Sequence, residues 1–195
     1  MSRYAIDVAI LPPPPVMDLA IAWNRKLSLL AKQSIGLNKT DVLPHISLLM
    51  GCVTDHNLPA AMSALQRIVQ NTSSMILKVT AHRFTEDSHP VAALDILTTA
   101  PLLALQQSLI EGLGSLIRYD TVQEDLYDAP SESMSALKWI NSFISEQVGL
   151  KFWPHITLGH GTTGDKQEMF TFTPDRLAIC HLGKHCTCRK VLAVF

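Results

Sequence analysis

Apolar and polar residues follow one another along the chain in patterns that predict short strands and amphipathic helices. Strands are expected where apolar residues alternate with polar ones or form short runs between turn residues, at 3–11, 43–53, 74–84, 91–97, 152–158, 177–182 and 186–194. Helices are expected where apolar residues recur every three or four positions, at 17–34, 55–70, 101–117 and from Ser131 or Ser133 to 148. The elements alternate irregularly, and two pairs of strands are predicted to form hairpins. The pattern therefore predicts an α+β fold with mainly antiparallel sheets and flanking helices.

Composition narrows the class of protein. The chain has 195 residues, with 16 basic and 17 acidic side chains and a net charge of −1. Proteins that grip long nucleic acid carry a clear basic excess, so no long duplex partner is expected. No apolar run approaches the roughly 18 residues of a membrane span, and the N-terminus is too interrupted for a secretory signal. With only 4 cysteines, a disulfide framework is not expected, so we predict a cytoplasmic protein. We also expect it to be a monomer and to have no membrane partner.

A repeated motif carries the functional signal. The segment Pro44-His45-Ile46-Ser47-Leu48 recurs as Pro154-His155-Ile156-Thr157-Leu158, and a glycine follows at the same offset in both, Gly51 and Gly161. Each copy comes after a predicted helix and lies in a predicted strand. A duplication that preserved only packing would explain the repeated proline, isoleucine and leucine. It would not explain why a titratable residue and a hydroxyl recur together, so a functional pair is the better interpretation.

Strand geometry indicates what this pair could do. Side chains alternate along a strand, so His45 and Ser47 share one face, as do His155 and Thr157. If the duplicated halves meet, one cleft holds two imidazoles and two hydroxyls. Two histidines can serve as general base and general acid at neutral pH, and hydroxyls can donate hydrogen bonds to phosphate oxygens. In-line displacement at phosphorus needs such groups on opposite sides and, with this set, needs no cofactor or metal.

These paired motifs resemble the signature of the 2H phosphoesterase superfamily, which includes 2′-5′ RNA ligases and RNA 2′,3′-cyclic phosphodiesterases. The resemblance implies a single bilobal domain over 1–195, with two pseudo-symmetric lobes and a central cleft. It implies metal-independent cleavage of a 2′,3′-cyclic phosphate or a 2′-5′ linkage at a small nucleotide or RNA end, and in some members the reverse ligation. By position, His45 and His155 would be the acid/base pair, and Ser47 and Thr157 would bind phosphate. Which histidine is the acid stays open, as does a non-catalytic nucleotide or RNA-end binding protein of the same fold.

Residues around the second motif are further candidates. Some members of the superfamily add aromatic or basic residues that hold a base or a phosphate, and this resemblance makes Lys151, Phe152 and Trp153, which directly precede the motif, candidate substrate-binding residues. A core or rim role is the simpler interpretation for each. His160 has the opposite parity to His155 on an ideal strand, so we expect it to face away from the cleft.

The C-terminal segment offers a competing site. If Gly183-Lys184 forms a two-residue turn, His181, Cys186 and Cys188 would share a face and could bind zinc or another soft metal. The spacing is not that of a standard zinc finger, and three ligands leave the site incomplete unless Cys180 or a distant residue joins them. Packing thiols are the simpler interpretation, so no metal is expected.

Overall fold

A computed structural model gives the structure of the protein and describes residues 2–30, 35–85, 90–128, 134–163, 167–174 and 176–195. The strands are β1 (Arg3–Leu11), β2 (Ile46–Thr54), β3 (Leu77–Phe84), β4 (Val91–Ile96), β5 (His155–His160), β6 (Phe170–Phe172), β7 (Arg176–Leu182) and β8 (Cys188–Val194). The α-helices are α1 (Pro14–Leu30), α2 (Leu58–Gln70), α3 (Ala100–Leu113) and α4 (Met134–Glu146). Three short 3₁₀ turns complete the described elements, at Gln123–Asp125, Gly149–Lys151 and Lys184–Cys186.

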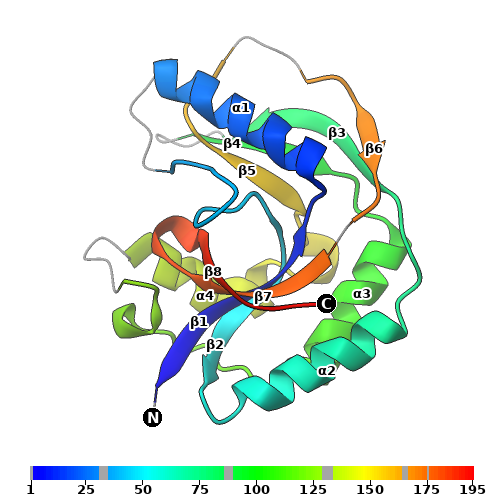
Figure 1. Ribbon diagram of the computed structural model, residues 1–195, viewed down its shortest axis with the longest axis vertical. Coiled ribbons are helices and arrows are strands. Elements are labelled where there is room, and N and C mark those ends of the chain that lie inside the picture. The colour runs from blue at the N-terminus through cyan, green and yellow to red at the C-terminus, as the bar shows by residue number, and fades with distance from the viewer. Residues whose placement is uncertain (1, 31–34, 86–89, 129–133, 164–166, 175) are drawn as a thin grey trace.

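The strands form two antiparallel sheets that match one another strand for strand. The first sheet has the order β2-β1-β7-β8 and the second the order β5-β4-β3-β6. Figure 1 shows the second sheet in the upper half of the molecule and the first in the lower half. In both sheets the strand that carries the repeated motif, β2 or β5, lies at one edge in this order. The predicted α+β fold with two related antiparallel lobes is confirmed.

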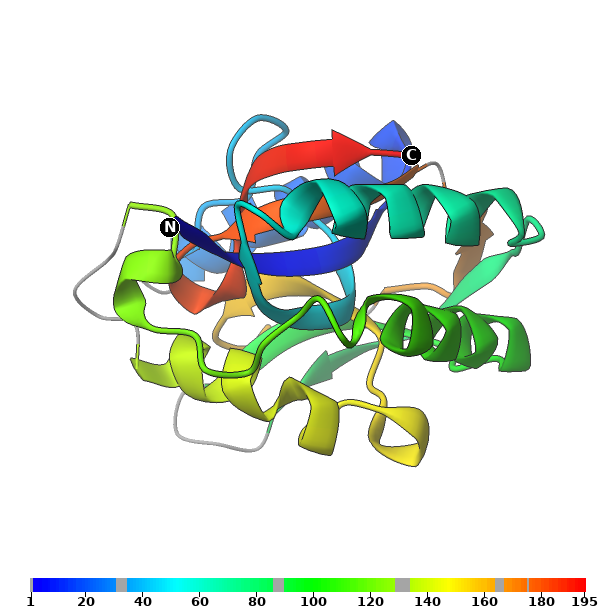
Figure 2. The same cartoon turned by 90° about the horizontal axis from the view of Figure 1, so that it is seen from below.

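The helices tie the two sheets together. Helix α1 follows β1 in the chain but packs against β5 of the other sheet, whereas α3 and α4 pack against β2. Helices α2 and α3 lie side by side, as Figure 2 shows. Each motif strand is therefore covered by helices that come from the other half of the sequence, and the two motifs are held in one body.

The apolar pattern explains these elements, and the differences from it have local causes. Strand β1 is buried from Ala5 to Leu11, because it lies between β2 and β7 in its sheet. Helix α1 begins at Pro14, inside the proline run, because proline is tolerated in the first helical turn. The three-residue strand β6 was not predicted, since so short a segment leaves no periodicity to detect. Ser131 and Ser133, the predicted caps of α4, lie outside the described residues.

Candidate active site

A β-bulge interrupts each motif strand at the same place. In the pairing of β1 with β2, Val8 faces Leu49 and Ala9 faces Ser47, so Leu48 is the extra residue. In the pairing of β4 with β5, the register skips Leu158 in the same way. A bulge leaves its extra residue outside the ladder and re-aims the neighbouring side chains. The two motifs thus share a backbone irregularity as well as a sequence.

A buried side-chain amide bonds to the carbonyl of each bulged residue. Asn24 of α1 donates through Nδ2 to the Leu158 oxygen at 2.7 Å, and Gln106 of α3 donates through Nε2 to the Leu48 oxygen at 3.2 Å. Both amides are almost fully buried, where an unpaired carbonyl would be costly. Each helix thereby stabilises the bulge next to a motif hydroxyl.

The four motif side chains line one cavity of about 260 Å³. His45 and Ser47 contribute from the first sheet, and His155 and Thr157 from the second. Apolar and aromatic groups complete much of the wall, including Leu37, Met50, Trp139, Phe143, Phe152 and Trp153. A largely apolar cavity with a few convergent polar groups is typical of a small-molecule site.

Both histidines are oriented in the same manner. Nδ1 of His45 lies 2.7 Å from the carbonyl oxygen of Leu43, and Nδ1 of His155 lies 2.8 Å from the carbonyl oxygen of Trp153. A carbonyl oxygen only accepts, so Nδ1 carries the proton and donates in both rings. Each neutral imidazole therefore keeps its lone pair on Nε2, the nitrogen available for chemistry.

The surroundings of His155 are aromatic. The Trp153 indole stacks on its imidazole with ring centroids 3.9 Å apart, and the indole Nε1 donates to Asp95 Oδ1 at 2.8 Å. Asp95 Oδ2 also forms an ion pair with Arg83 at 2.7 Å. Burial lowers the pKa of His155 to about 4; the hydrogen bond to the Trp153 carbonyl opposes this shift, and the charge of His45 adds to it. His155 is accordingly a neutral imidazole at pH 7.

The surroundings of His45 contain a buried carboxylate. Asp7 on β1 is fully buried, and its Oδ2 lies 3.6 Å from His45 Nε2. Burial raises the pKa of Asp7 to about 6, against the opposing effects of His45, the Ser47 hydroxyl and the Leu48 amide. The two histidines thus share an orientation but have different electrostatic partners.

Of the three candidate substrate-binding residues before the second motif, two lie at the cavity and one does not. Phe152 and Trp153 line the cavity. Lys151 is exposed and is not among the lining residues; its ammonium donates to the Ser145 carbonyl at 2.9 Å and lies 3.4 Å from Glu146. The stacking and hydrogen bond of Trp153 indicate that it orients His155, a role that the sequence did not suggest.

The expected orientation of His160 is wrong. His160 lines the cavity, because the bulge at Leu158 reverses the alternation of side chains beyond it. Met50, which occupies the matching position after the bulge in β2, lines the cavity for the same reason. An ideal alternation cannot show this, since the sequence does not reveal the bulge.

The predicted arrangement of the C-terminal cluster is also wrong. The turn between β7 and β8 contains a 3₁₀ segment rather than two residues, and His181 faces Lys190 instead of Cys186. His181 Nε2 lies 2.8 Å from the Asp125 carbonyl oxygen, and its ring contacts Tyr4 and Tyr127. Among the described residues, Cys188 instead comes within 4.8 Å of Asp7 and His45.

Sequence reasoning missed three residues that now belong to this site. Asp7 is a charge within an apolar strand, and Asn24 and Gln106 are amides on apolar helix faces. Buried polar residues of this kind require a partner, so the breaks in the apolar pattern were the available signal. The partners themselves are distant in sequence and could not be named from it.

The fold and the paired motifs define a 2H-type phosphoesterase architecture, and the comparisons agree. The family sequence model of the 2′-5′ RNA ligase superfamily matches residues 32–175 of the chain, and the chain belongs to that superfamily. It is similar in fold to TT0787 of Thermus thermophilus, with 15% identity, a TM-score of 0.63, and coverage of 98% of this chain and 96% of that one.

Escherichia coli LigT in its apo form has the same fold, with 13% identity, a TM-score of 0.57, and coverage of 100% of this chain and 98% of that one. LigT is also known in complex with 3′-AMP, and that structure gives the same values. No curated protein sequence matches the chain. Within the described residues, every helix is too short or too polar to cross a membrane.

Proposed function

We propose that this protein is a metal-independent phosphodiesterase that acts on 2′,3′-cyclic phosphates or 2′-5′-linked nucleotide or RNA ends, and that the reaction can run in reverse as a ligation. The observation that carries the proposal is the convergence of His45, Ser47, His155 and Thr157 on one cavity. Both imidazoles there keep Nε2 available, because Nδ1 is bonded to a backbone carbonyl. Membership of the 2′-5′ RNA ligase superfamily supports the same class of reaction.

In the hydrolytic direction, His155 is the base and His45 the acid. Nε2 of neutral His155 takes a proton from water as the water oxygen bonds to phosphorus. The bond from phosphorus to the leaving ribose oxygen breaks, and His45 gives its Nε2 proton to that oxygen. The lowered pKa of His155 suits the base, and the buried Asp7 carboxylate lies 3.6 Å from Nε2 of the proposed acid. Ser47 and Thr157 donate hydrogen bonds to the non-bridging oxygens.

The cavity favours a substrate of nucleotide size. Its volume of about 260 Å³ and its aromatic wall, with Phe152 and Trp139, suit one phosphate with one attached nucleoside. Aromatic side chains can stack on any base, which gives affinity without strict sequence preference. We expect a monomer that handles one nucleotide or RNA end at a time, in keeping with a net charge of −1.

The test is turnover of a panel of 2′,3′-cyclic nucleotides and 2′-5′-linked dinucleotides with chelator present. We expect His45→Ala and His155→Ala each to lower kcat by at least about 100-fold, as loss of a general acid or base does. His56→Ala is the matched control, because His56 is exposed beyond the end of β2. Full turnover by both active-site variants would contradict the proposal. Tight binding of a cyclic nucleotide without product would instead identify a binding protein.

A further inference from the structure

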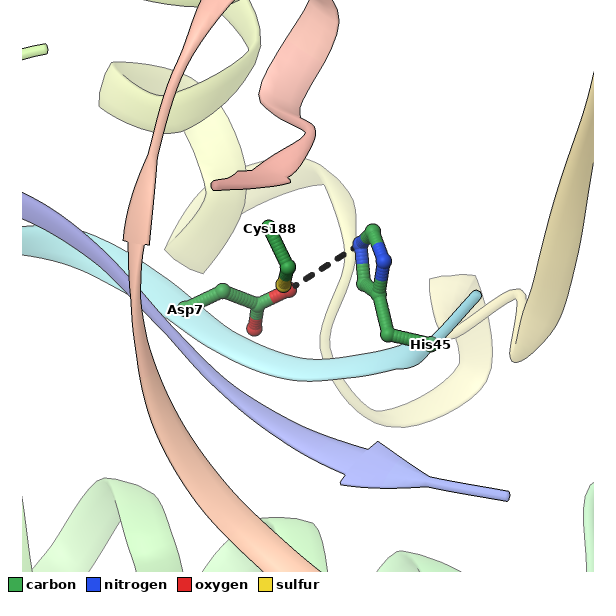
Figure 3. A group of neighbouring side chains, drawn as sticks. All are labelled: Asp7, His45 and Cys188. Carbon is green, nitrogen blue, oxygen red and sulfur yellow. Dashed lines mark ion pairs between the residues drawn. The ribbon is translucent and has the colours of Figure 1, made fainter. Parts of the chain in front are cut away.

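Three side chains of different chemistry meet beside the active-site cavity. Asp7 comes from β1, His45 from the residue before β2, and Cys188 from the start of β8 (Figure 3). One ligand atom from each lies within 4.8 Å of the other two. A bridge between Leu43 and Cys188 brings the start of β8 next to the first motif. The grouping is thus fixed by backbone pairing rather than by long mobile side chains.

The carboxylate in this group lacks its ordinary partners. Asp7 is 0% exposed. The Ser47 hydroxyl and the Leu48 amide lie near enough to lower its pKa, but in the described part of the chain neither Asp7 oxygen has a hydrogen-bond partner of good geometry. Buried carboxylates are normally hydrogen-bonded, ion-paired or bound to a metal. Its Oδ2 is directed at His45 Nε2, as Figure 3 shows. In neutral His45 that nitrogen carries a lone pair, so a cation between the two atoms, either a proton on His45 or a metal ion, would be stabilised.

The separation of the two atoms fits two ligands of one metal ion better than it fits a direct hydrogen bond. Oδ2 and Nε2 are 3.6 Å apart, beyond the roughly 2.7–3.2 Å of an N–H···O hydrogen bond. Two ligands on a tetrahedral zinc ion, each about 2.0–2.1 Å from the metal, are separated by about 3.4 Å. His45 Nδ1 already donates to the Leu43 carbonyl, the outer contact that orients many metal-binding histidines.

We propose that Asp7, His45 and Cys188 form a zinc-binding site, and that zinc switches off the enzyme by occupying Nε2 of His45. A carboxylate, an imidazole and a thiolate together suit zinc, whereas magnesium and calcium favour oxygen ligands. His45 also lines the cavity, so water from the cavity can supply the fourth ligand. Zinc binding stands on the geometry alone, and only the inhibition rests on the proposed function.

Zinc binding is tested on the full chain after metals have been removed with a chelator. Zinc is titrated in competition with a chromophoric zinc indicator, and we expect one ion per chain. Asp7→Asn and Cys188→Ala should each weaken the affinity at least about tenfold, because each removes one of three protein ligands. Cys186→Ala is the matched control and should bind as the wild type does, because Cys186 is a neighbouring thiol outside the group. Circular dichroism shows whether each variant is folded.

A second measurement does not depend on variants. Cobalt added to the metal-free wild type should give the absorption of a tetrahedral ion with a thiolate-to-metal band, and Cys188→Ala should lack that band while Cys186→Ala keeps it. Absence of stoichiometric zinc binding would overturn the proposal. Loss of binding in Cys186→Ala with binding intact in Asp7→Asn would also overturn it, because the metal would then belong to the cysteines of the C-terminal segment.

Inhibition by zinc is tested by measuring turnover of a 2′,3′-cyclic nucleotide, and each variant is compared with its own metal-free rate. Zinc should inhibit the wild type at the concentration that saturates the site, chelator should restore the rate, and Cys188→Ala should need at least about tenfold more zinc. Undiminished turnover at saturating zinc would refute inhibition. If no substrate is turned over, the proposed function fails, while the indicator and cobalt experiments still decide the zinc site.

Discussion

Replacing Trp153 with phenylalanine separates two roles that this side chain could have. The substitution keeps an aromatic ring that can stack on His155, whose centroid lies 3.9 Å from that of the indole. It removes the indole N–H, which donates to Asp95 Oδ1 at 2.8 Å. If Trp153 positions His155, the lost hydrogen bond should affect both stability and kcat. If it only provides a surface for the substrate, the remaining ring should preserve both.

The expected loss of stability follows from the charge of the acceptor, the Asp95 carboxylate. A hydrogen bond to a charged group contributes about 1.5–3 kcal/mol, and losing the donor leaves the carboxylate oxygen unsatisfied. Asp95 is 7% exposed, but Arg83 still holds its other oxygen at 2.7 Å. We therefore expect Trp153→Phe to lower the free energy of unfolding by about 2 kcal/mol. Looser orientation of His155 should lower kcat about tenfold, with KM changed less than about twofold.

Urea denaturation and steady-state kinetics on a 2′,3′-cyclic nucleotide give these quantities. Trp23→Phe is the control, because the Trp23 indole donates to Gln167 Oε1 at the similar distance of 2.9 Å, but to a neutral acceptor and outside the cavity lining. That variant should lose only about 1 kcal/mol and keep its kcat. An unchanged unfolding free energy in Trp153→Phe, or a raised KM with full kcat, would refute the positioning role.

Three further predictions concern the site and its supports. Because the pKa of His155 is lowered to about 4, the base stays neutral in mild acid, and the acidic limb of the profile of kcat/KM against pH should lie near pH 4; a limb near the ordinary histidine pKa of about 6.5 would contradict the assignment of His155 as base. Gly51→Ala should lower the free energy of unfolding by about 1–3 kcal/mol, because a Cβ there overlaps the Ile117 side chain and lies 2.9 Å from the Arg118 oxygen. Urea denaturation measures this loss, and Gly36→Ala is the control, because a Cβ at Gly36 meets nothing within 4 Å. Gln106→Leu should lower the free energy of unfolding by about 1–3 kcal/mol, because the buried Leu48 carbonyl loses its donor. The control Gln107→Leu removes only an exposed hydrogen bond to Glu111 and should change stability by less than about 0.5 kcal/mol; equal losses in the two variants would show that the buried amide does not support the bulge.

The repeated motif was readable from the sequence because its chemistry repeats at residues that have no packing reason to recur. His45 with Ser47 and His155 with Thr157 do line the same cavity. The α+β fold was also predictable, since strands such as β1 and β4 are mostly apolar segments between turn residues. Both inferences rest on local patterns, and local patterns are what a single sequence records.

The parts that could not be predicted depend on register and on contacts distant in sequence. A bulge at Leu158 brings His160 to the cavity, and no residue at that position identifies the bulge. The neighbour of Asp7 is His45, just before β2. The sequence offered only a conditional grouping of Cys188 with His181 and Cys186, whereas the structure places it near Asp7 and His45. Each is set by how the strands pair, which requires the three-dimensional structure.

The symmetry of the scaffold and the asymmetry of its surroundings have different consequences for the chemistry. Bulges, buried amides and carbonyl-bonded Nδ1 atoms repeat in both motifs, and they place two imidazoles in equivalent orientations. Two equivalent imidazoles would not by themselves provide an acid and a base at one pH, because general acid–base catalysis needs one protonated and one neutral group. The neighbours provide the difference: an aromatic ring and burial keep His155 neutral, whereas a buried carboxylate lies beside His45. A buried carboxylate beside an imidazole also suits a metal ion, so the neighbour that supports His45 as the proposed acid is the one that makes it the histidine proposed to bind zinc.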